Sequence, residues 1–250
     1  MRREPQLPDA DYTIRDQQHM KAAIRYFHWQ YQLAAPHLGR RVLEVGCGIG
    51  NTTQLLLDRD LVVGIDVEER CVDERVRRFS RHANVVTRMI DVVDPELLSL
   101  AQYRFDTVLC LNVLEHIRDD TTALEHMHGV LEPGGTVILI VPAFEMLFGP
   151  IDTKLGHYRR YSRRQIAELA DAAGFECAVL HYMNVIGMLG WWFNARLLRK
   201  AEQSDAQIRF FDSWIVPILS RTERMVHPIC GQNVFAVLRK VATGRRARAQ

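Results

Sequence analysis

Three closely spaced glycines after a short apolar run are the strongest chemical signal in this chain. Residues 42–53 read VLEVGCGIGNTT. Gly46 permits a sharp exit from a strand, while Gly48 and Gly50 let a ligand approach the backbone closely. A helix expected at 52–58 would add free N–H groups and partial positive charge. Residue 51 is Asn, so the third glycine of the dinucleotide fingerprint G-x-G-x-x-G is displaced, which favours a ligand without pyrophosphate. A tight turn without a ligand is the alternative.

The next apolar run ends in an acid. Asp66 closes LVVGID, 20 residues after Gly46, which is the spacing at which a carboxylate meets a ribose in nucleotide-binding α/β proteins. A carboxylate accepts hydrogen bonds from both ribose hydroxyls and repels a 2′-phosphate, which disfavours NADP. A simple helix N-cap is the alternative role for Asp66.

Two further runs end in polar residues. Asp91 in RMIDVVD can accept a hydrogen bond from an adenine amine, with Ile90 and Val92 beside the ring, or can be an ordinary loop aspartate. Asn112 follows an apolar run in LCLNVLEHI, where its side chain and backbone can hold the amino-acid end of a ligand.

The elements that position these residues alternate between two patterns. Apolar runs without polar alternation are typical of strands buried on both faces, and they alternate with helical patterns. This order predicts an α/β fold with a doubly wound, mostly parallel sheet and helices on both faces. The predicted strands are 41–45, 61–65, 85–90, 107–111 and 136–141, and the helices between them are 52–58, 68–81, 95–101 and 121–131.

The remaining segments complete a division of the chain. Ser162 and Gln165 form a capping box for a helix to Ala173 that stops at Gly174. Strands are expected at 177–183 and 233–238, with a helical insertion or cap at 185–230. An amphipathic helix at 16–38 lies within a lid segment, 1–39. The main domain is 40–240, and 241–250 is a basic tail.

In combination these motifs resemble class I, Rossmann-like, S-adenosylmethionine-dependent methyltransferases, most closely over 40–142. The matching motifs are VLEVGCGIGN, VVGIDV, MIDVVD, FDTVLCLNVLEHI and LEPGGTVILIVP. The resemblance implies a seven-stranded sheet of order 3-2-1-4-5-7-6 with an antiparallel last strand. It implies S-adenosylmethionine as cofactor and S-adenosylhomocysteine as product. The implied cofactor contacts are Glu44, Gly46, Cys47, Gly48 and Asn51 at the methionine part, Asp66 and Val67 at the ribose, Asp91 and Val92 at the adenine, and Asn112 beneath the sulfonium.

The loop after the fifth strand is expected to border the methyl acceptor. Residues 148–175, which contain GHYRRYS, resemble a bacterial methyltransferase subgroup without an evident common substrate. His157 is the predicted base for a hydroxyl, with Asp152 able to orient it, although a structural histidine is the alternative. The predicted acceptor contacts are Tyr158, Arg160, Tyr161 and His116. The arginines from 159 to 164 are alternatively solvated or paired with Asp152.

No metal is expected. An acid–histidine pair such as Glu115–His116 binds a divalent ion in some relatives, but the sequence shows no further Cys, His or Asp cluster to complete a ligand set. The scattered cysteines show neither disulfide nor metal spacing. The charged run 75–81 is interpreted as a solvated helix face.

Composition and charge restrict the classes of partner and the location that the sequence allows. The formal net charge of +2 shows no electrostatic footprint for nucleic acid. A signal peptide and an apolar run long enough for a bilayer are both missing, so a soluble, cytoplasmic monomer or homodimer is expected. The insertion is rich in aromatic residues, among them Trp191, Trp192 and Trp214. Three alternative roles are open for them: core packing, a lid over an apolar acceptor, or contact with a membrane surface.

The sequence thus predicts an enzyme that methylates an oxygen of a small molecule, such as a secondary metabolite, a sugar or a lipid-linked intermediate. N- or C-methylation, a non-catalytic module with the cofactor fold, a nucleic-acid methyltransferase and an NAD-linked oxidoreductase are the alternatives.

Overall fold

The computed structural model describes residues 23–193 and 205–241. Residues 1–22 of the predicted lid, 194–204 of the predicted insertion and nearly all of the predicted basic tail lie outside this range.

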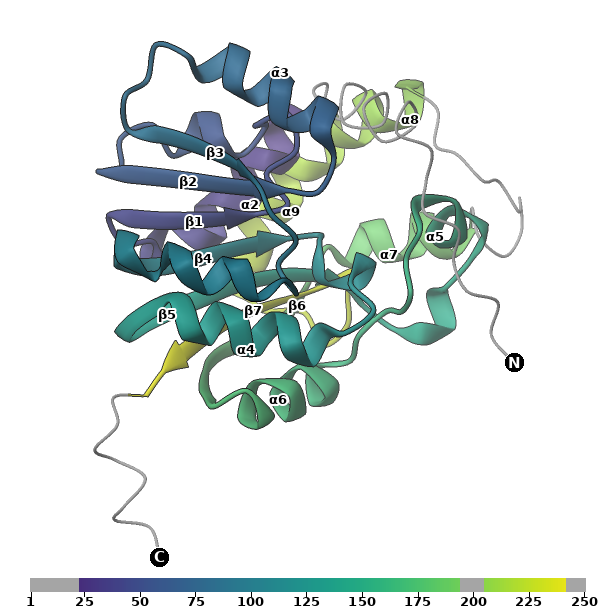
Figure 1. Ribbon diagram of the computed structural model, residues 1–250. Helices are drawn as coiled ribbons and strands as arrows, with labels where there is room; N and C mark the ends of the chain where they lie inside the picture. The colour runs from purple at the N-terminus through teal and green to yellow at the C-terminus, as the bar shows by residue number, and fades with distance from the viewer. Residues whose placement is uncertain (1–22, 194–204, 242–250) are drawn as a thin grey trace, which may run out of the picture.

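A seven-stranded sheet forms the centre of the molecule (Figure 1). Its order, β3-β2-β1-β4-β5-β7-β6, confirms the predicted fold class. β7 runs antiparallel to both of its neighbours, and the other neighbouring strands pair in parallel. The strands are β1 (Arg41–Val45), β2 (Leu61–Asp66), β3 (Val85–Met89), β4 (Phe105–Leu111), β5 (Leu131–Pro142), β6 (Phe175–Met183) and β7 (Asn233–Lys240).

Helices cover both faces of the sheet. Alternate strand residues point to opposite faces, so Leu43 and Val42 belong to separate apolar clusters. The first cluster lies under α4 (Asp120–Val130) and α6 (Arg163–Ala172), and the second lies under α2 (Ile24–Ala34) and α9 (Val216–Met225). α3 (Glu69–Phe79) packs along β2 and β3.

The start and the end of α6 agree with the prediction from the sequence. Ser162 Oγ accepts from the Gln165 N–H, and the Gln165 side chain accepts from the Ser162 N–H at 2.8 Å. Gly174, with φ +87°, follows the last turn. The predicted capping box and stop are therefore confirmed.

The helix predicted at 52–58 is wrong. Only one 3-10 turn, η2 (Thr53–Leu55), follows the glycines. Thr52 and Thr53 are β-branched and weak helix formers, and the Thr53 hydroxyl is bonded to a strand residue. The helix predicted at 95–101 is likewise a 3-10 helix, η3 (Pro95–Tyr103).

The described part of the segment between β6 and β7 is largely helical up to Met225, as predicted, and residues 226–232 form a loop before β7. It contains α7 (Val185–Trp192), α8 (Asp205–Phe210), a π-helical stretch η7 (Phe211–Ile215) and α9. The Asp212 carboxylate of η7 accepts from the N–H groups of Arg25 and Tyr26 at the start of α2. The N-terminal helix is thereby fixed to the insertion.

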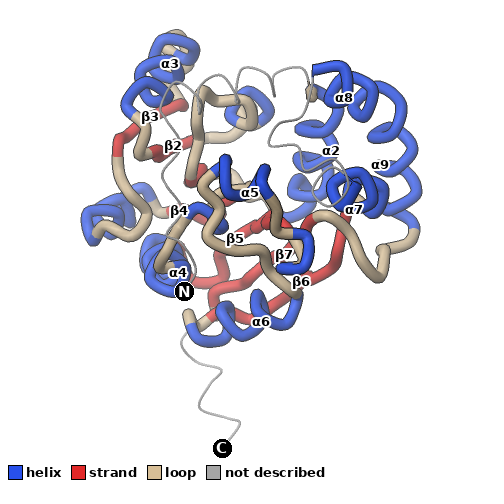
Figure 2. The backbone as a smooth tube through the Cα atoms, turned by 90° about the vertical axis from the view of Figure 1, so that its right-hand side faces the viewer, coloured by secondary structure: helices blue, strands red, loops and turns tan. Residues whose placement is uncertain are grey.

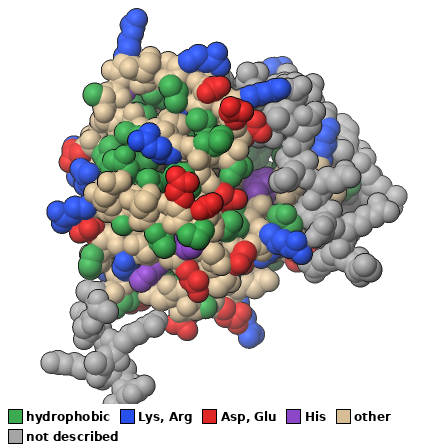
Figure 3. Space-filling model, in the orientation of Figure 1, with side chains coloured by type: hydrophobic (Ala, Val, Ile, Leu, Met, Phe, Trp, Pro, Cys, Tyr) green, Lys and Arg blue, Asp and Glu red, His purple; other side chains and the backbone are tan. Residues whose placement is uncertain are grey.

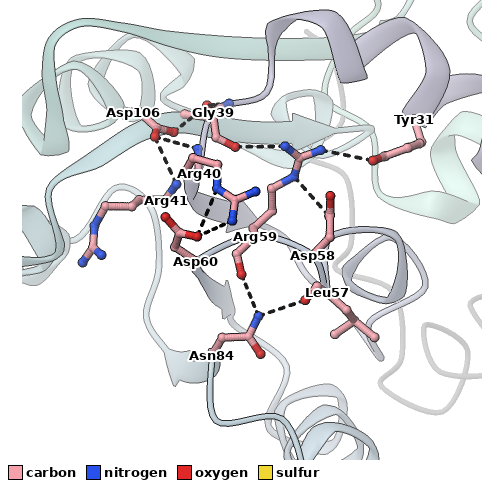
Figure 4. A network of polar contacts seen from close by, with 11 residues as sticks. Tyr31, Gly39, Arg40, Arg41, Leu57, Asp58, Arg59, Asp60, Asn84 and Asp106 are labelled. Atoms are coloured by element: carbon pink, nitrogen blue, oxygen red, sulfur yellow. Dashed lines mark hydrogen bonds and ion pairs between the residues drawn. The ribbon is translucent and has the colours of Figure 1, made fainter.

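Polar contacts join the amino ends of the strands (Figure 4). The Asp106 carboxylate of β4 accepts from the backbone N–H groups of Arg40 and Arg41 at 2.7 and 3.1 Å. Arg59, just before β2, donates to the Tyr31 hydroxyl of α2. These bonds fix the end of the sheet opposite the glycine loop.

Candidate active site

The candidate site lies at the carboxyl ends of the strands. Val45 of β1 is aligned with Ile65 of β2 and Cys110 of β4, so the loops after these strands emerge side by side. The loop after β4 contains η4 (Leu114–His116), and the loop after β5 contains η5 (Glu145–Leu147) and α5 (Pro150–Leu155). Figure 2, which faces this side of the molecule, shows α5 in front of the strand ends.

The glycine loop has the backbone conformation that the sequence predicts. Gly46, Gly48 and Gly50 all have positive φ, at 65°, 48° and 82°, a region that L side chains rarely adopt. A Cβ on Gly46 would lie 2.3 Å from a methyl of Val113 in the loop after β4. Gly46 therefore allows both the turn and the close approach of that loop.

Asp66 connects the two loops that should hold a nucleoside. Its Oδ2 accepts from the Gly48 N–H at 2.7 Å, and its Oδ1 accepts from the Glu68 N–H at 3.0 Å. Burial raises the pKa of this carboxyl, and the backbone bonds oppose that rise. The N-cap of α3 is Glu68 rather than Asp66. The carboxylate offers about four acceptor positions, so these bonds leave capacity that a ribose hydroxyl can use.

Glu44 is held in a buried network. Its Oε2 accepts from the Thr53 hydroxyl at 2.5 Å and pairs with the Arg75 guanidinium at 3.5 Å. Arg75 also donates to Thr53, to Thr87 and to the Val86 carbonyl. Burial raises the pKa of Glu44, while Arg75 and Thr53 lower it. The carboxylate predicted to meet the methionine part thus anchors the glycine loop to α3.

The interpretation of 75–81 as a solvated face is wrong at Arg75, whose side chain is completely buried. Cys71, Arg75 and Phe79 are the buried residues of α3, so they share one face at i, i+4 spacing. A second signal was Gly64 within a buried strand. Its missing side chain leaves the space that the guanidinium fills, since a Cβ there would lie 2.4 Å from Arg75 Cζ.

The remaining predicted cofactor residues differ in exposure. Val67 and Asp91 are exposed, and Asp91 accepts from the Val93 N–H within its own loop. Val92 and Cys47 are buried, and Val92 belongs to the core cluster under α4. Asn51 lies in the glycine loop, where its side-chain oxygen accepts from Arg78.

Asn112 follows the last residue of β4 and has a left-handed conformation, φ +55°. Its N–H donates to Ile140 O at 2.7 Å, and its side-chain oxygen accepts from Asn233 at 3.4 Å. Asn233 in turn accepts from the Tyr26 hydroxyl. Tyr26 therefore brings α2 to the same edge of the sheet.

His157 lies in a charged, buried arrangement after α5. Its Nδ1 is 2.8 Å from Asp152 Oδ1, and Arg160 Nε donates to the same oxygen at 2.8 Å. Burial raises the pKa of Asp152, but these two partners outweigh it and hold the pKa below its usual range. The structure thus brings Asp152 to the position expected for orienting the imidazole.

The predicted acceptor contacts divide into two kinds. Arg160 is buried over the Trp191 ring and donates to Ala143 O. The Tyr161 hydroxyl donates to Asp120 Oδ2 at 2.9 Å. Both side chains therefore hold the loop after β5 in place through buried contacts. Tyr158 is half-buried and keeps part of its surface accessible.

Glu115 and His116 complete this part of the site. Both lie against His157, and the His116 and His157 rings are 4.6 Å apart edge to face. Burial raises the pKa of Glu115 to about 7. Burial, followed by the charge of His157, lowers the pKa of His116 to about 3. The expectation that nothing completes a ligand set around this pair is wrong, because His157 supplies a third donor within reach.

The sheet order and the glycine-loop edge define the Rossmann-like methyltransferase fold. A family model described as methyltransferase domain matches residues 17–180. The chain belongs to this methyltransferase domain family, which confirms the resemblance at family level. The narrower subgroup with the GHYRRYS loop stays a prediction.

Named relatives agree with this assignment. The chain is 32% identical to a probable S-adenosylmethionine-dependent methyltransferase of Mycolicibacterium smegmatis, over 58% of this chain and 55% of that protein. It is 36% identical to a ubiquinone biosynthesis O-methyltransferase of Alkalilimnicola ehrlichii, over 40% of each chain. The chain thus spans about half the length of these relatives.

A solved structure shares the fold. The N-methyltransferase NodS of Bradyrhizobium japonicum, in complex with S-adenosyl-L-homocysteine, superimposes with a TM-score of 0.53 at 15% identity, covering 91% of this chain and 87% of NodS.

Proposed function

We propose that this chain is a methyltransferase that transfers a methyl group from S-adenosylmethionine to an oxygen of a small molecule. One observation carries the proposal: the Asp66-linked glycine loop and the buried Asp152–His157 pair emerge at the same edge of the sheet. The first provides a cradle for an adenosyl group, and the second provides an oriented imidazole for the acceptor.

The chemistry requires little besides alignment. The acceptor oxygen attacks the methyl carbon, the S–CH₃ bond breaks, its electron pair returns to sulfur, and neutral S-adenosylhomocysteine leaves. Holding the reactants in line supplies most of the acceleration. The hydroxyl proton passes to His157 Nε2, because Asp152 occupies Nδ1.

The acceptor class rests on two arguments. The oriented imidazole favours a hydroxyl, whose proton must be removed, over an amine or a carbon nucleophile. The similarity to proteins named ubiquinone biosynthesis O-methyltransferases supports the same choice at the level of a small molecule. Methylation of nitrogen or carbon is the alternative. A non-catalytic module has no need for the buried Asp152–His157 pair.

The surface supports a small-molecule acceptor and a peripheral membrane contact. Basic and acidic side chains are interspersed on the face in Figure 3, unlike a groove for nucleic acid. In the described residues, no helix has both the length and the apolar character to cross a bilayer. The described insertion exposes large apolar side chains, at Leu189, Trp192, Phe193, Phe210, Trp214 and Ile218.

Asp66→Ala tests the cradle. The substitution removes the charged acceptor for the ribose hydroxyls, so S-adenosylhomocysteine should bind about 10- to 100-fold more weakly. Isothermal titration calorimetry measures the affinity, and circular dichroism checks the fold. Asp73→Ala removes the same charge from an exposed position of α3 and should bind normally. Equal affinity in Asp66→Ala and the parent chain contradicts the ribose assignment.

Gly46→Ala tests the backbone requirement. The new Cβ is strained at φ +65° and collides with Val113, so S-adenosylhomocysteine should bind at least about tenfold more weakly. The double variant Gly46→Ala/Val113→Ala removes the collision and should recover part of the affinity. Gly134→Ala is the control, because it places a Cβ at a comparable positive φ, +81°, where no atom lies within 4 Å. This variant should leave binding unchanged. Normal binding by Gly46→Ala excludes a cofactor in this turn.

A further inference from the structure

Two loops converge on a set of three donor groups. Glu115 and His116 belong to η4, and His157 follows α5. One ligand-type atom from each side chain lies within 4.8 Å of the other two. Zinc bonds carboxylate oxygen and imidazole nitrogen at roughly 2.0–2.2 Å. Small side-chain rotations would therefore bring all three atoms onto one ion.

Glu115 carries an unsatisfied group. Its side chain is 1% exposed, and its Oε2 has no hydrogen-bond partner among the described residues. A buried carboxylate oxygen without a partner is destabilising. The imidazoles of His116 and His157 lie within reach of it. A cation between the three side chains would bond the carboxylate and one nitrogen of each imidazole at the same time.

Both imidazoles are already oriented as metal-bound histidines are. His157 Nδ1 is held by Asp152 at 2.8 Å. His116 is hydrogen-bonded to the backbone of Leu155. In protein metal sites the second ring nitrogen is typically bonded to a carboxylate or a backbone carbonyl, which fixes the tautomer and leaves the other nitrogen for the ion.

We propose that Glu115, His116 and His157 bind one divalent transition-metal cation. Two imidazoles with one carboxylate suit zinc and its neighbours, while magnesium prefers oxygen ligands. Three protein ligands leave at least one coordination position for water or for a ligand. The ion is held at the carboxyl ends of β4 and β5, on the acceptor side of the site.

The ion changes the role of His157 in the proposed methyl transfer. A hydroxyl bound at the open position becomes more acidic and can release its proton to solvent, so His157 serves as a ligand and not as the base. This consequence depends on the proposed function. Binding of the ion does not depend on it, and it can be measured without cofactor or acceptor.

The test is metal binding by the full-length chain. The protein is stripped with a chelator, dialysed against zinc chloride and analysed for zinc by mass spectrometry. We expect about one zinc ion per chain in the parent protein, and loss of that ion in Glu115→Gln, His116→Ala and His157→Ala. His82→Ala removes an exposed histidine outside the set and should keep the ion. Cobalt(II) replaces zinc for a visible spectrum that reports nitrogen and oxygen ligation directly.

Asp152→Asn tests the support of His157. It keeps the three ligand side chains but removes the charge that orients His157 and pairs with Arg160, so zinc affinity should fall about 10- to 100-fold. Circular dichroism and S-adenosylhomocysteine binding verify that each variant is folded. An absence of zinc and cobalt binding in the folded parent chain overturns the proposal, as does normal binding in folded Glu115→Gln and His157→Ala. Neither outcome affects the assignment of the cofactor cradle.

Discussion

Replacing Arg75 with Met should lower the free energy of unfolding by about 3–5 kcal/mol, the usual cost of removing one partner from a buried ion pair. Arg75 is completely buried and is bonded to Glu44, Thr53, Thr87 and the Val86 carbonyl. Methionine fills part of the volume but supplies no donor, so Glu44 would be left buried without its cation. Urea denaturation followed by circular dichroism measures the loss.

A matched control lies on the same helix. Arg77 is 74% exposed and pairs with Glu74 on the surface, so Arg77→Met should change stability by less than about 1 kcal/mol. The double variant Glu44→Met/Arg75→Met removes both charges and should lose less than the sum of the single changes, with a coupling above about 1 kcal/mol. Equal stability of Arg75→Met and Arg77→Met, or strict additivity, contradicts the buried pair as an anchor.

The order of the elements could be predicted because buried parallel strands have apolar sequences. Residues 41–45 were predicted with the observed bounds of β1. β5 begins at Leu131, five residues earlier than expected, because Leu131 pairs with Phe105 before the register shifts. The predicted strand began only after the EPGG motif, at residue 136. Local sequence does not reveal that a neighbouring strand extends the pairing past such residues.

The site could be predicted where one segment determines the geometry. The positive φ angles of the glycine loop follow from the glycines themselves. Arg75 was misassigned because the charged run around it was treated as uniform, although Cys71 and Phe79 at helical spacing marked a buried face. The cluster of Glu115, His116 and His157 joins two loops more than 40 residues apart. Its assembly depends on α5 and on the salt bridge from Arg160 to Asp152, which no local pattern determines.

Replacing His157 with Ala should reduce turnover about 10²- to 10⁴-fold while S-adenosylhomocysteine binds as tightly as to the parent chain. The range is that of a lost general base. The His157 imidazole is bonded to Asp152, whereas Asp66 is bonded to the glycine loop, so the cofactor cradle should be unaffected. Transfer of tritiated methyl to a panel of hydroxylated small molecules measures turnover, and calorimetry measures cofactor affinity. His82→Ala is the control. Near-normal turnover by His157→Ala would exclude any role of this imidazole in activating the acceptor hydroxyl.

The pattern across neighbouring residues then decides how His157 acts. If the imidazole alone removes the proton, Glu115→Gln should cost far less than His157→Ala, and a chelator should leave the parent rate unchanged. If the imidazole holds an ion, Glu115→Gln, His116→Ala and His157→Ala should all lose turnover to a similar extent. The reason is that ligands of one ion act as a unit, whose single losses are not additive. The chelator should then abolish the parent rate, and added zinc should restore it. Because Asp152 orients the ring in either case, Asp152→Asn lowers turnover under both mechanisms, so the ligand variants and the response to chelator and zinc are the measurements that separate them.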